Sequence, residues 1–310
     1  MANTESMKVN RPRRPTLDLH RLEQFVAVVE WGSLTDAAAE LKVTQQALSV
    51  AIKALEEQLG VTLFVRTRGM RPSPAGRRLY ESAQVLLAGA HKLVPDVQAV
   101  AQERRESITV GYTPAVSSMD VFDTVGTLVP PDVLLSVERL FPSTLRTRML
   151  AGELDLALRR GIATPEGFAS HVIGHHRLAV ALRSVDAARF DGTAISLREL
   201  TDETLVLWAP ESRSSFSAFL LAQCRRLGFD PAAESSRFQG LDAAAAPLAH
   251  GNGYSLVATD PGIYFGGRVT VLPLREEILS PVQALWLPTT RTGAAGELIE
   301  ALERRNGGAG

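Results

Sequence analysis

Residues 25–67 read FVAVVEWGSLTDAAAELKVTQQALSVAIKALEEQLGVTLFVRT, and this stretch decides the fold of the N-terminal part of the chain. From Leu17 onward apolar residues recur every three or four positions until Gly32, which predicts a first helix with a glycine stop. Ser33 then lies three residues before Asp36, the spacing of a capping box. A short second helix with small residues is therefore expected directly after the first.

A third helix is predicted from Thr44, an N-cap candidate, to Gly60. Its apolar positions form one stripe, which is expected to be buried: Leu48, Ala51, Ile52, Leu55 and Leu59. The opposite side carries the residues Gln45, Gln46, Ser49, Val50 and Lys53. Two helices joined by a tight turn, the second with an exposed polar face, form the helix-turn-helix unit that enters the DNA major groove, here spanning residues 34–53.

The chemistry of this face fits base reading. Glutamine amides pair with adenine edges, Val50 can pack on a thymine methyl group, and Lys53 suits a phosphate. A three-helix bundle without DNA contact is the alternative interpretation. The residues that follow favour a winged helix-turn-helix over that bundle. They predict a strand at 61–65, a basic turn at 66–69 and a short returning strand at 70–71.

The run quoted above, continued by RPSPAG at 71–76, resembles the DNA-binding domain of LysR-type transcriptional regulators. The resemblance places that domain at 17–74. It implies recognition-helix roles for Thr44, Gln45, Ser49 and Lys53, and implies that Arg66 and Arg68 lie in a wing that reaches toward the minor groove. Gln46 and Val50 depart from the residues usual in the family. We therefore expect the operator sequence to be particular to this chain, with Val50 as an apolar thymine reader.

A long helix is predicted after Ser73-Pro74, within a linker segment at 74–105. Its apolar positions alternate four and three residues apart, as in a coiled-coil seam, and predict dimerisation through Leu79, Ala83, Leu86, Ala90 and Leu93. An amphipathic helix packed on its own chain is the alternative. Pro95 predicts a kink or an early end. A homodimer would match a two-fold, interrupted inverted-repeat operator, and the family resemblance extends this to a homotetramer.

From residue 106 to about 305 short β-rich runs alternate with helical stretches, which predicts an α/β body. Strands are expected at 108–112, 133–138, 155–158, 178–182, 205–208, 254–258, 269–272 and 282–287, with a closing helix at 294–304. Thr113-Pro114 and Phe141-Pro142-Ser143 are each expected to start a helix at the end of a strand. Such helix starts are natural anion sites.

GELDLAL at 152–158 and LAHGNGYSLVA at 248–258 resemble the effector domain of the same family, which is similar to two-lobed, type 2 periplasmic solute-binding proteins. The resemblance implies a first lobe at 108–176 and 268–303 and a second lobe at 177–267. It also implies a small organic effector, for instance a carboxylate, bound between the lobes by Thr113, Pro114, Ser143, Arg160, Pro210, Ser212 and Phe238.

Composition limits the other function classes. The first 80 residues hold 12 Lys and Arg against 8 Asp and Glu, a net charge of +4, while the remainder is at −5, so a mildly basic head with a flexible basic tail at 1–16 is joined to an acidic body. The sequence contains neither a membrane-length apolar run nor a signal peptide, which predicts a cytoplasmic protein. A single cysteine, Cys224, excludes a two-cysteine redox switch.

The sequence disfavours two other functions. An enzyme is disfavoured because the sequence lacks the HExxH, GxSxG, GxGxxG and P-loop motifs. The histidines at 171, 175, 176 and 250 have no metal-site spacing, so we expect them at loop or surface positions. No catalytic residue, no metal and no cofactor are therefore expected. A solute-binding protein would need an export signal and would have no use for the head. The sequence therefore predicts a DNA-binding regulator whose effector shifts the lobe orientation, with RNA polymerase as a further candidate partner.

Overall fold

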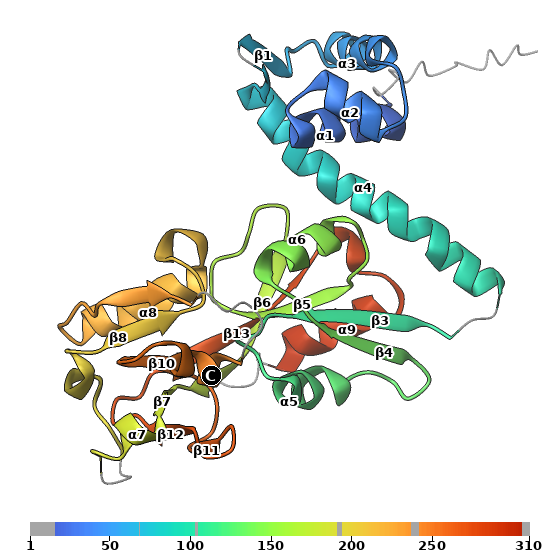
Figure 1. The fold of residues 1–310 in the computed structure, drawn as a ribbon. Coiled ribbons are helices and arrows are strands. Elements are labelled where there is room, and N and C mark those ends of the chain that lie inside the picture. Colours follow the sequence, from blue (N-terminus) through green and yellow to red (C-terminus); the bar gives the residue numbers. More distant parts are fainter. Residues whose placement is uncertain (1–15, 68, 103–104, 191–193, 237–241, 306–310) are drawn as a thin grey trace, which may run out of the picture. The chain divides into compact units, whose positions relative to one another are not determined.

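The computed structural model describes residues 16–67, 69–102, 105–190, 194–236 and 242–305, and the chain divides into two compact units at residue 87 (Figure 1). In the first unit α1 (Leu19–Trp31), α2 (Leu34–Glu40) and α3 (Gln45–Leu59) precede the hairpin of β1 (Phe64–Thr67) and β2 (Gly69–Pro72). The predicted winged helix-turn-helix is thus confirmed. The predicted first strand at 61–65 begins three residues later, at Phe64.

Side-chain caps begin all three helices, and those of Ser33 and Thr44 were predicted from the sequence. The side chains of Asp18, Ser33 and Thr44 accept hydrogen bonds from main-chain N–H groups in the first turns of α1, α2 and α3. Gly32 and Gly60 end α1 and α3 in the left-handed conformation, at φ +63° and +69°, which costs a glycine little. One core built around Phe25, Leu48 and Leu55 joins the helices to the hairpin.

Close backbone contacts fasten the hairpin to the start of α4 (Pro74–Ala101). The Ser73 N–H donates to the Leu63 carbonyl at 2.8 Å, and the Ser73 hydroxyl donates to the Thr62 carbonyl at 2.7 Å. A β-carbon on Gly76 would lie 2.1 Å from the carbonyl oxygen of Leu63. Only glycine lets the first turn of α4 approach the hairpin this closely.

Helix α4 runs without interruption through Pro95 to Ala101, so the early end predicted there is wrong. Pro95 is exposed. Water can therefore satisfy the carbonyl group that the missing proline N–H leaves unpaired one turn earlier. The described helices contain none that is long and apolar enough to cross a membrane.

Two sheets form the second unit. The first has the order β4-β3-β5-β13-β6 and the second the order β11-β12-β7-β10-β8-β9. Their strands are β3 (Ser107–Tyr112), β4 (Leu134–Arg139), β5 (Leu156–Arg160), β6 (Ala169–Arg177), β7 (Ala179–Arg183), β8 (Thr204–Leu207), β9 (Ala233–Ser235), β10 (Gly253–Val257), β11 (Gly262–Tyr264), β12 (Val269–Pro273) and β13 (Leu279–Trp286). The chain crosses between the sheets at 178 and again at 274–278, which confirms a two-lobed α/β body.

Helices cover these sheets and fill their crossovers. The α-helices are α5 (Ser118–Val121), α6 (Pro142–Leu150), α7 (Ser184–Ala187), α8 (Ser215–Arg226) and α9 (Gly293–Arg305). A π-helical turn follows α5 at Phe122–Gly126, and 3-10 turns lie at Leu197–Leu200, Glu211–Arg213, Ala243–Ala249 and Pro288–Thr290. Side chains of α9, including Leu298 and Leu302, share one core with β3, β5 and β13.

Three predictions for the body need correction. Strand β12 pairs with β7, so the second lobe extends through Pro273 rather than ending at 267. Thr113-Pro114 forms a turn and starts no helix, because Ser117 caps α5 in a capping box with Asp120. The histidines at 171, 175 and 176, expected at loop or surface positions, lie on strand β6, where His175 is exposed and the other two are half-buried. Their segment lacks the alternating apolar pattern that marks a strand.

We expect Gly76→Ala to lower the free energy of unfolding by about 1–3 kcal/mol, because the new methyl group must displace the Leu63 backbone. Chemical denaturation of the full chain measures the change. Gly251→Ala is the matched control, since a β-carbon there meets nothing within 4 Å. Equal stability of the two variants would show that the hairpin moves without cost.

Candidate nucleic-acid interface and small-molecule site

Helix α3 presents two chemically different sides. Leu48, Ile52 and Leu55 are buried in the core of the first unit. On the other side Gln45, Gln46 and Lys53 are exposed, Ser49 is half-exposed, and Val50 keeps 68% of its surface. The predicted reading residues thus share one solvent-facing side.

Two of the predicted contact residues already have partners in the protein. The Thr44 hydroxyl accepts the Ala47 N–H at 3.2 Å, so its first role is to cap α3. Lys53 Nζ lies 3.7 Å from Glu57 Oε1, in a pair with both side chains about two-thirds exposed or more. Because an exposed pair of this kind contributes at most about 1 kcal/mol, Lys53 can exchange Glu57 for a phosphate.

The end of α3 holds the wing. Glu56 Oε1 accepts the N–H groups of Leu63, at 2.7 Å, and Phe64, at 3.4 Å. The wing is also tied to the first helix, because the Met70 N–H donates to the Gly32 carbonyl at 3.1 Å. These contacts were not predicted from the sequence. Of the two predicted wing residues, Arg68 lies outside the described residues, and Arg66 is placed only by its backbone in β1.

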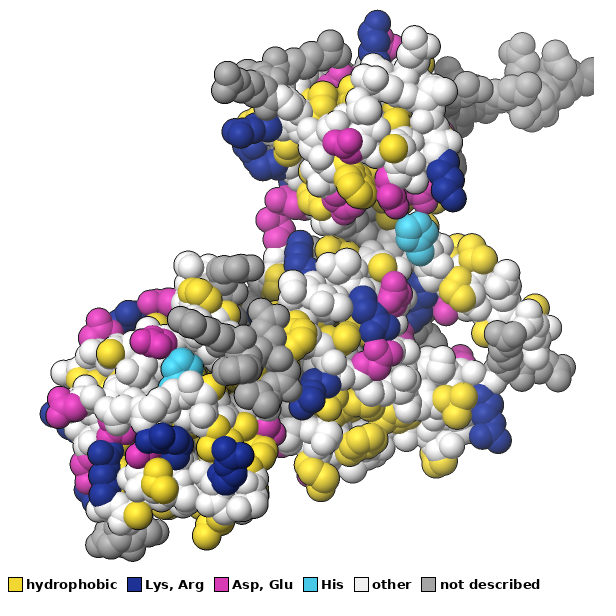
Figure 2. Space-filling view, in the orientation of Figure 1, with side chains coloured by type: hydrophobic (Ala, Val, Ile, Leu, Met, Phe, Trp, Pro, Cys, Tyr) yellow, Lys and Arg dark blue, Asp and Glu magenta, His cyan; other side chains and the backbone are white. Residues whose placement is uncertain are grey.

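Charges of both signs are mixed on one face of the molecule. On the face drawn in Figure 2, lysine and arginine side chains are interspersed with acidic ones over the described residues of each unit. Phosphate contacts carry no sequence information directly, so any sequence preference must come from side chains that reach base edges or from the shape of the DNA.

In the second unit, most of the predicted effector residues follow the carboxyl ends of parallel strands. β4, β3 and β5 are mutually parallel neighbours, and Thr113, Ser143 and Arg160 come at or after their ends. In the other lobe Pro210 and Ser212 follow β8, which is parallel to both its neighbours. Ligands of open α/β sheets bind at such edges. Phe238 lies outside the described residues.

The two strand edges meet at one close approach. A β-carbon on Gly161, directly after β5, would lie 3.1 Å from the Ser215 hydroxyl at the start of α8. Ser214 caps α8, but Phe141 gives α6 no side-chain cap. Ser143 and Thr144 in the first turn of α6 are exposed, whereas Thr113 is buried. Amides in an uncapped first turn are suited to bind an anion.

Arg160 has a different environment from the one predicted. Its side chain is 1% exposed, and its guanidinium donates to the Ala115 carbonyl at 2.5 Å and to Asp120 Oδ2 at 3.2 Å. It also contacts His176 Nδ1 at 3.2 Å and the Ser280 carbonyl at 3.4 Å. Protein groups thus occupy the donors that were expected to face a ligand, and Arg160 ties β5 to α5, β6 and β13.

Burial and charge shift the ionisation of this cluster. Desolvation lowers the pKa of Arg160 to about 10, although the Asp120 carboxylate opposes the shift. Burial raises the pKa of Asp120, but the hydrogen bond and charge of His176, the Ser117 N–H and the Arg160 charge outweigh it, so this pKa lies below its usual range. The cluster is a compensated ion pair at the edge of the first lobe.

Both units match sequence models of one family. Residues 19–77 match the bacterial regulatory helix-turn-helix protein model of the lysR family, and residues 101–307 match the LysR substrate binding domain. The chain belongs to the LysR family of bacterial transcriptional regulators. A LysR-type protein is a DNA-binding regulator with an effector-binding domain, which agrees with the division into two units.

Individual relatives agree with this assignment. The chain is 27% identical over 296 residues to the HTH-type transcriptional regulator TfdS of Cupriavidus pinatubonensis, covering 94% of this chain and 99% of TfdS. It is 33% identical over 147 residues to the nitrogen assimilation regulatory protein nac of Klebsiella aerogenes, covering 46% of this chain and 48% of that protein. The crystal structure of CbnR, a LysR family transcriptional regulator, has the same fold, with a TM-score of 0.59 at 20% identity over 93% of this chain and 99% of CbnR.

We expect Arg160→Met to lower the free energy of unfolding by about 3 kcal/mol or more, because Asp120 then remains partly buried without its cation. Chemical denaturation near neutral pH measures the loss. Arg275→Met is the control, since the pair of Arg275 with Glu199 is exposed and should contribute at most about 1 kcal/mol. A loss no greater than the control's would mean that Arg160 is free to serve a ligand instead.

Proposed function

We propose that this LysR-type regulator reads its operator with the exposed side of α3, through Gln45, Gln46, Ser49 and Val50, while Lys53 and the wing residues Arg66 and Arg68 contact the backbone and minor groove. One observation carries the proposal: Val50 is 68% exposed in the middle of a polar helix face. An apolar side chain in that place gains nothing from water but can pack on a thymine methyl group.

Replacement of Val50 by arginine should change the preferred operator bases, because arginine pairs with guanine rather than with a methyl group. Selection from random DNA with the full chain measures the preference. Lys53→Met is the contrasting variant, and it should weaken all sequences alike and reduce the salt dependence by about one phosphate contact. An unchanged base preference in Val50→Arg would remove Val50 as a reader.

We also propose that α4 dimerises the protein in the cytoplasm and so presents two α3 helices to an interrupted inverted repeat. Leu86, Leu93, Val97 and Val100 repeat at coiled-coil spacing and keep 45–76% of their surfaces, and Ala90 is half-buried between them. The first two predicted seam residues differ. Ala83 is buried in the core of the first unit and Leu79 packs against that core, so the proposed seam begins at Leu86.

Leu93→Glu should convert dimers into monomers, since it places a charge at the centre of the apolar seam. Analytical ultracentrifugation of the full chain gives the mass. Val185→Glu, at a position 75% exposed on α7, is the control and should leave the mass unchanged. Dimers that persist in Leu93→Glu would exclude α4 as the main interface.

For the effector we propose a small organic acid, held at the first turn of α6 between the strand edges of the two lobes. Support comes from the uncapped amides at Ser143 and Thr144 and from the strand ends that surround them. Thr113, Pro114, Pro210 and Ser212 would complete the wall, with Arg160 holding the edge in place. The protein is proposed to act by binding rather than catalysis, with RNA polymerase as the partner that responds to the bound effector.

Thr144→Asp should abolish the stabilisation that a small carboxylate gives, because the two negative charges repel. The apo protein should keep or gain stability, since an acidic residue favours a helix N-terminus. A thermal-shift screen of aromatic and aliphatic carboxylates detects the ligand through the rise in melting temperature that binding causes. Thr144→Asn is the uncharged control. A carboxylate that stabilises all three proteins equally binds elsewhere.

A further inference from the structure

The second half of α4 approaches the first lobe most closely at two glycines. Gly152 has φ +73°, and a β-carbon there would lie 2.8 Å from the Ala88 carbonyl oxygen. A β-carbon on Gly89 would lie 3.0 Å from Thr289. Two glycines, one on each side, therefore allow the helix and the lobe to touch.

One turn further along α4, Lys92 forms an ion pair with Asp155 at the start of β5. The two side chains are 23% and 8% exposed, so the pair is largely removed from water. Two hydrogen bonds hold Asp155 in place without involving Lys92. Its Oδ2 accepts the Thr109 N–H at 2.8 Å, and its own N–H donates to the Thr109 carbonyl at 2.9 Å. Burial lowers the pKa of Lys92, while the charge of Asp96 opposes the shift.

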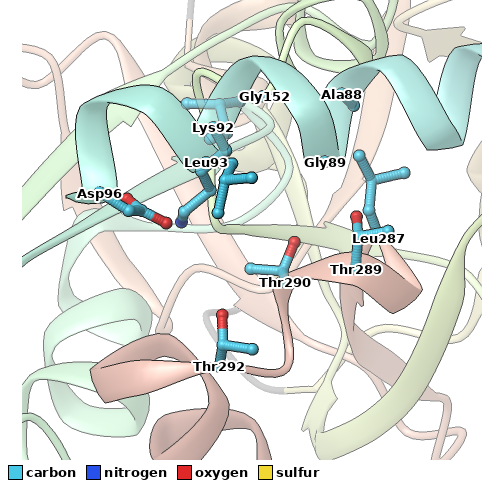
Figure 3. A pocket seen from close by; sticks show the side chains of 11 residues that line it. Ala88, Gly89, Lys92, Leu93, Asp96, Gly152, Leu287, Thr289, Thr290 and Thr292 are labelled. Atoms are coloured by element: carbon cyan, nitrogen blue, oxygen red, sulfur yellow. The ribbon is translucent and has the colours of Figure 1, made fainter. Parts of the chain in front are cut away.

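Beside this pair the packing is incomplete. Figure 3 shows Lys92, Leu93 and Asp96 of α4 on one side of a cavity of about 150 Å³, with Thr289, Thr290 and Thr292 on the other. The cavity is smaller than the roughly 300 Å³ at which small-molecule pockets begin. It therefore argues against a second ligand site.

We propose that Lys92 is a positioning residue: its ion pair with Asp155 fixes the direction in which α4 leaves the first lobe, and so sets the distance between operator half-sites that a dimer accepts. The inference rests on the proposed dimer and its operator. Helix α4 is continuous from Pro74 to Ala101, and its first turns pack in the core of the DNA-binding unit. The helix that carries Lys92 therefore continues directly into the DNA-binding unit.

Strand β5 connects the Lys92–Asp155 pair to the proposed effector site. Asp155 directly precedes β5, Arg160 is its last residue and Gly161 follows it, where the proposed effector site lies. One short strand thus joins the attachment of α4 to the edge where the two lobes meet.

The test uses the full chain and a set of duplexes in which two identical half-sites are separated by increasing numbers of base pairs. Wild type should bind one spacing most tightly. In Lys92→Met the ratio between the best and the next spacing should fall by about fivefold or more, the range of a typical coupling between sites. Affinity for a single half-site should not change. Lys92→Arg, which keeps the charge, should restore part of the preference, and Gln98→Ala, on an exposed position of α4, should behave as wild type.

The outcomes distinguish the proposed dimer from the positioning role of Lys92. A wild type without any spacing preference contradicts the proposed dimer and operator. A wild type with a preference that Lys92→Met retains overturns the positioning role alone. Should Lys92→Met unfold, a second variant replaces it, in which Lys92→Gln is combined with Gly89→Cys and Thr289→Cys. A disulfide between the two cysteines then takes the place of the ion pair. The oxidised protein should regain the spacing preference, and the reduced protein should lose it. An equal preference in both redox states overturns the proposal.

Discussion

Burial of one stripe of α3 is the constraint on which the recognition of DNA depends. Leu48, Ile52 and Leu55 enter the core that Phe25 and Phe64 share, and this fixes the rotation of α3 about its axis. With that rotation fixed, the glutamines and Val50 must face outward. The wing is held by the same helix, because Glu56 binds the backbone where the hairpin begins.

The effector-binding domain follows a comparable logic with strands in place of a helix. Short segments follow the parallel strands of each lobe, and Gly161 after β5 lies close to Ser215 of the other lobe. The Arg160 guanidinium forms hydrogen bonds within the protein, and the start of α6 at Ser143 and Thr144 has no side-chain cap. Arg160 is thus engaged within the protein, whereas the first turn of α6 is exposed.

Local signals in the sequence were enough to predict the head. Asp18, Ser33, Thr44, Gly32 and Gly60 act at helix ends, where the immediate neighbours decide the conformation. Long-range contacts could not be predicted in the same way. The strand β6 carries Gly174 and three histidines and exists because β13 pairs with it along eight residues. Thr113 resembles a helix cap, yet Ser117 takes that role in the structure.

Periodicity also could not tell which partner covers an apolar face. The seam spacing on α4 holds from Leu79 to Val100, but the first turns pack in the head and only the later ones remain exposed. The same limit applies to Lys92 and Asp155, which are 63 positions apart and show no shared pattern. The sequence therefore predicted the effector-site and dimer residues without showing which of them are buried. In the structure some of these residues have partners within the chain and others are exposed.

The central claim is that the outward side of α3 lies against base edges in the major groove. The most direct measurement is site-specific photocrosslinking from position 50 of the full chain to its own promoter DNA, with the crosslinked nucleotides identified by sequencing. We expect crosslinks to major-groove bases in two half-sites separated by a fixed distance. Crosslinks scattered along the fragment without a preferred base, or none at this position while the complex forms, would contradict it.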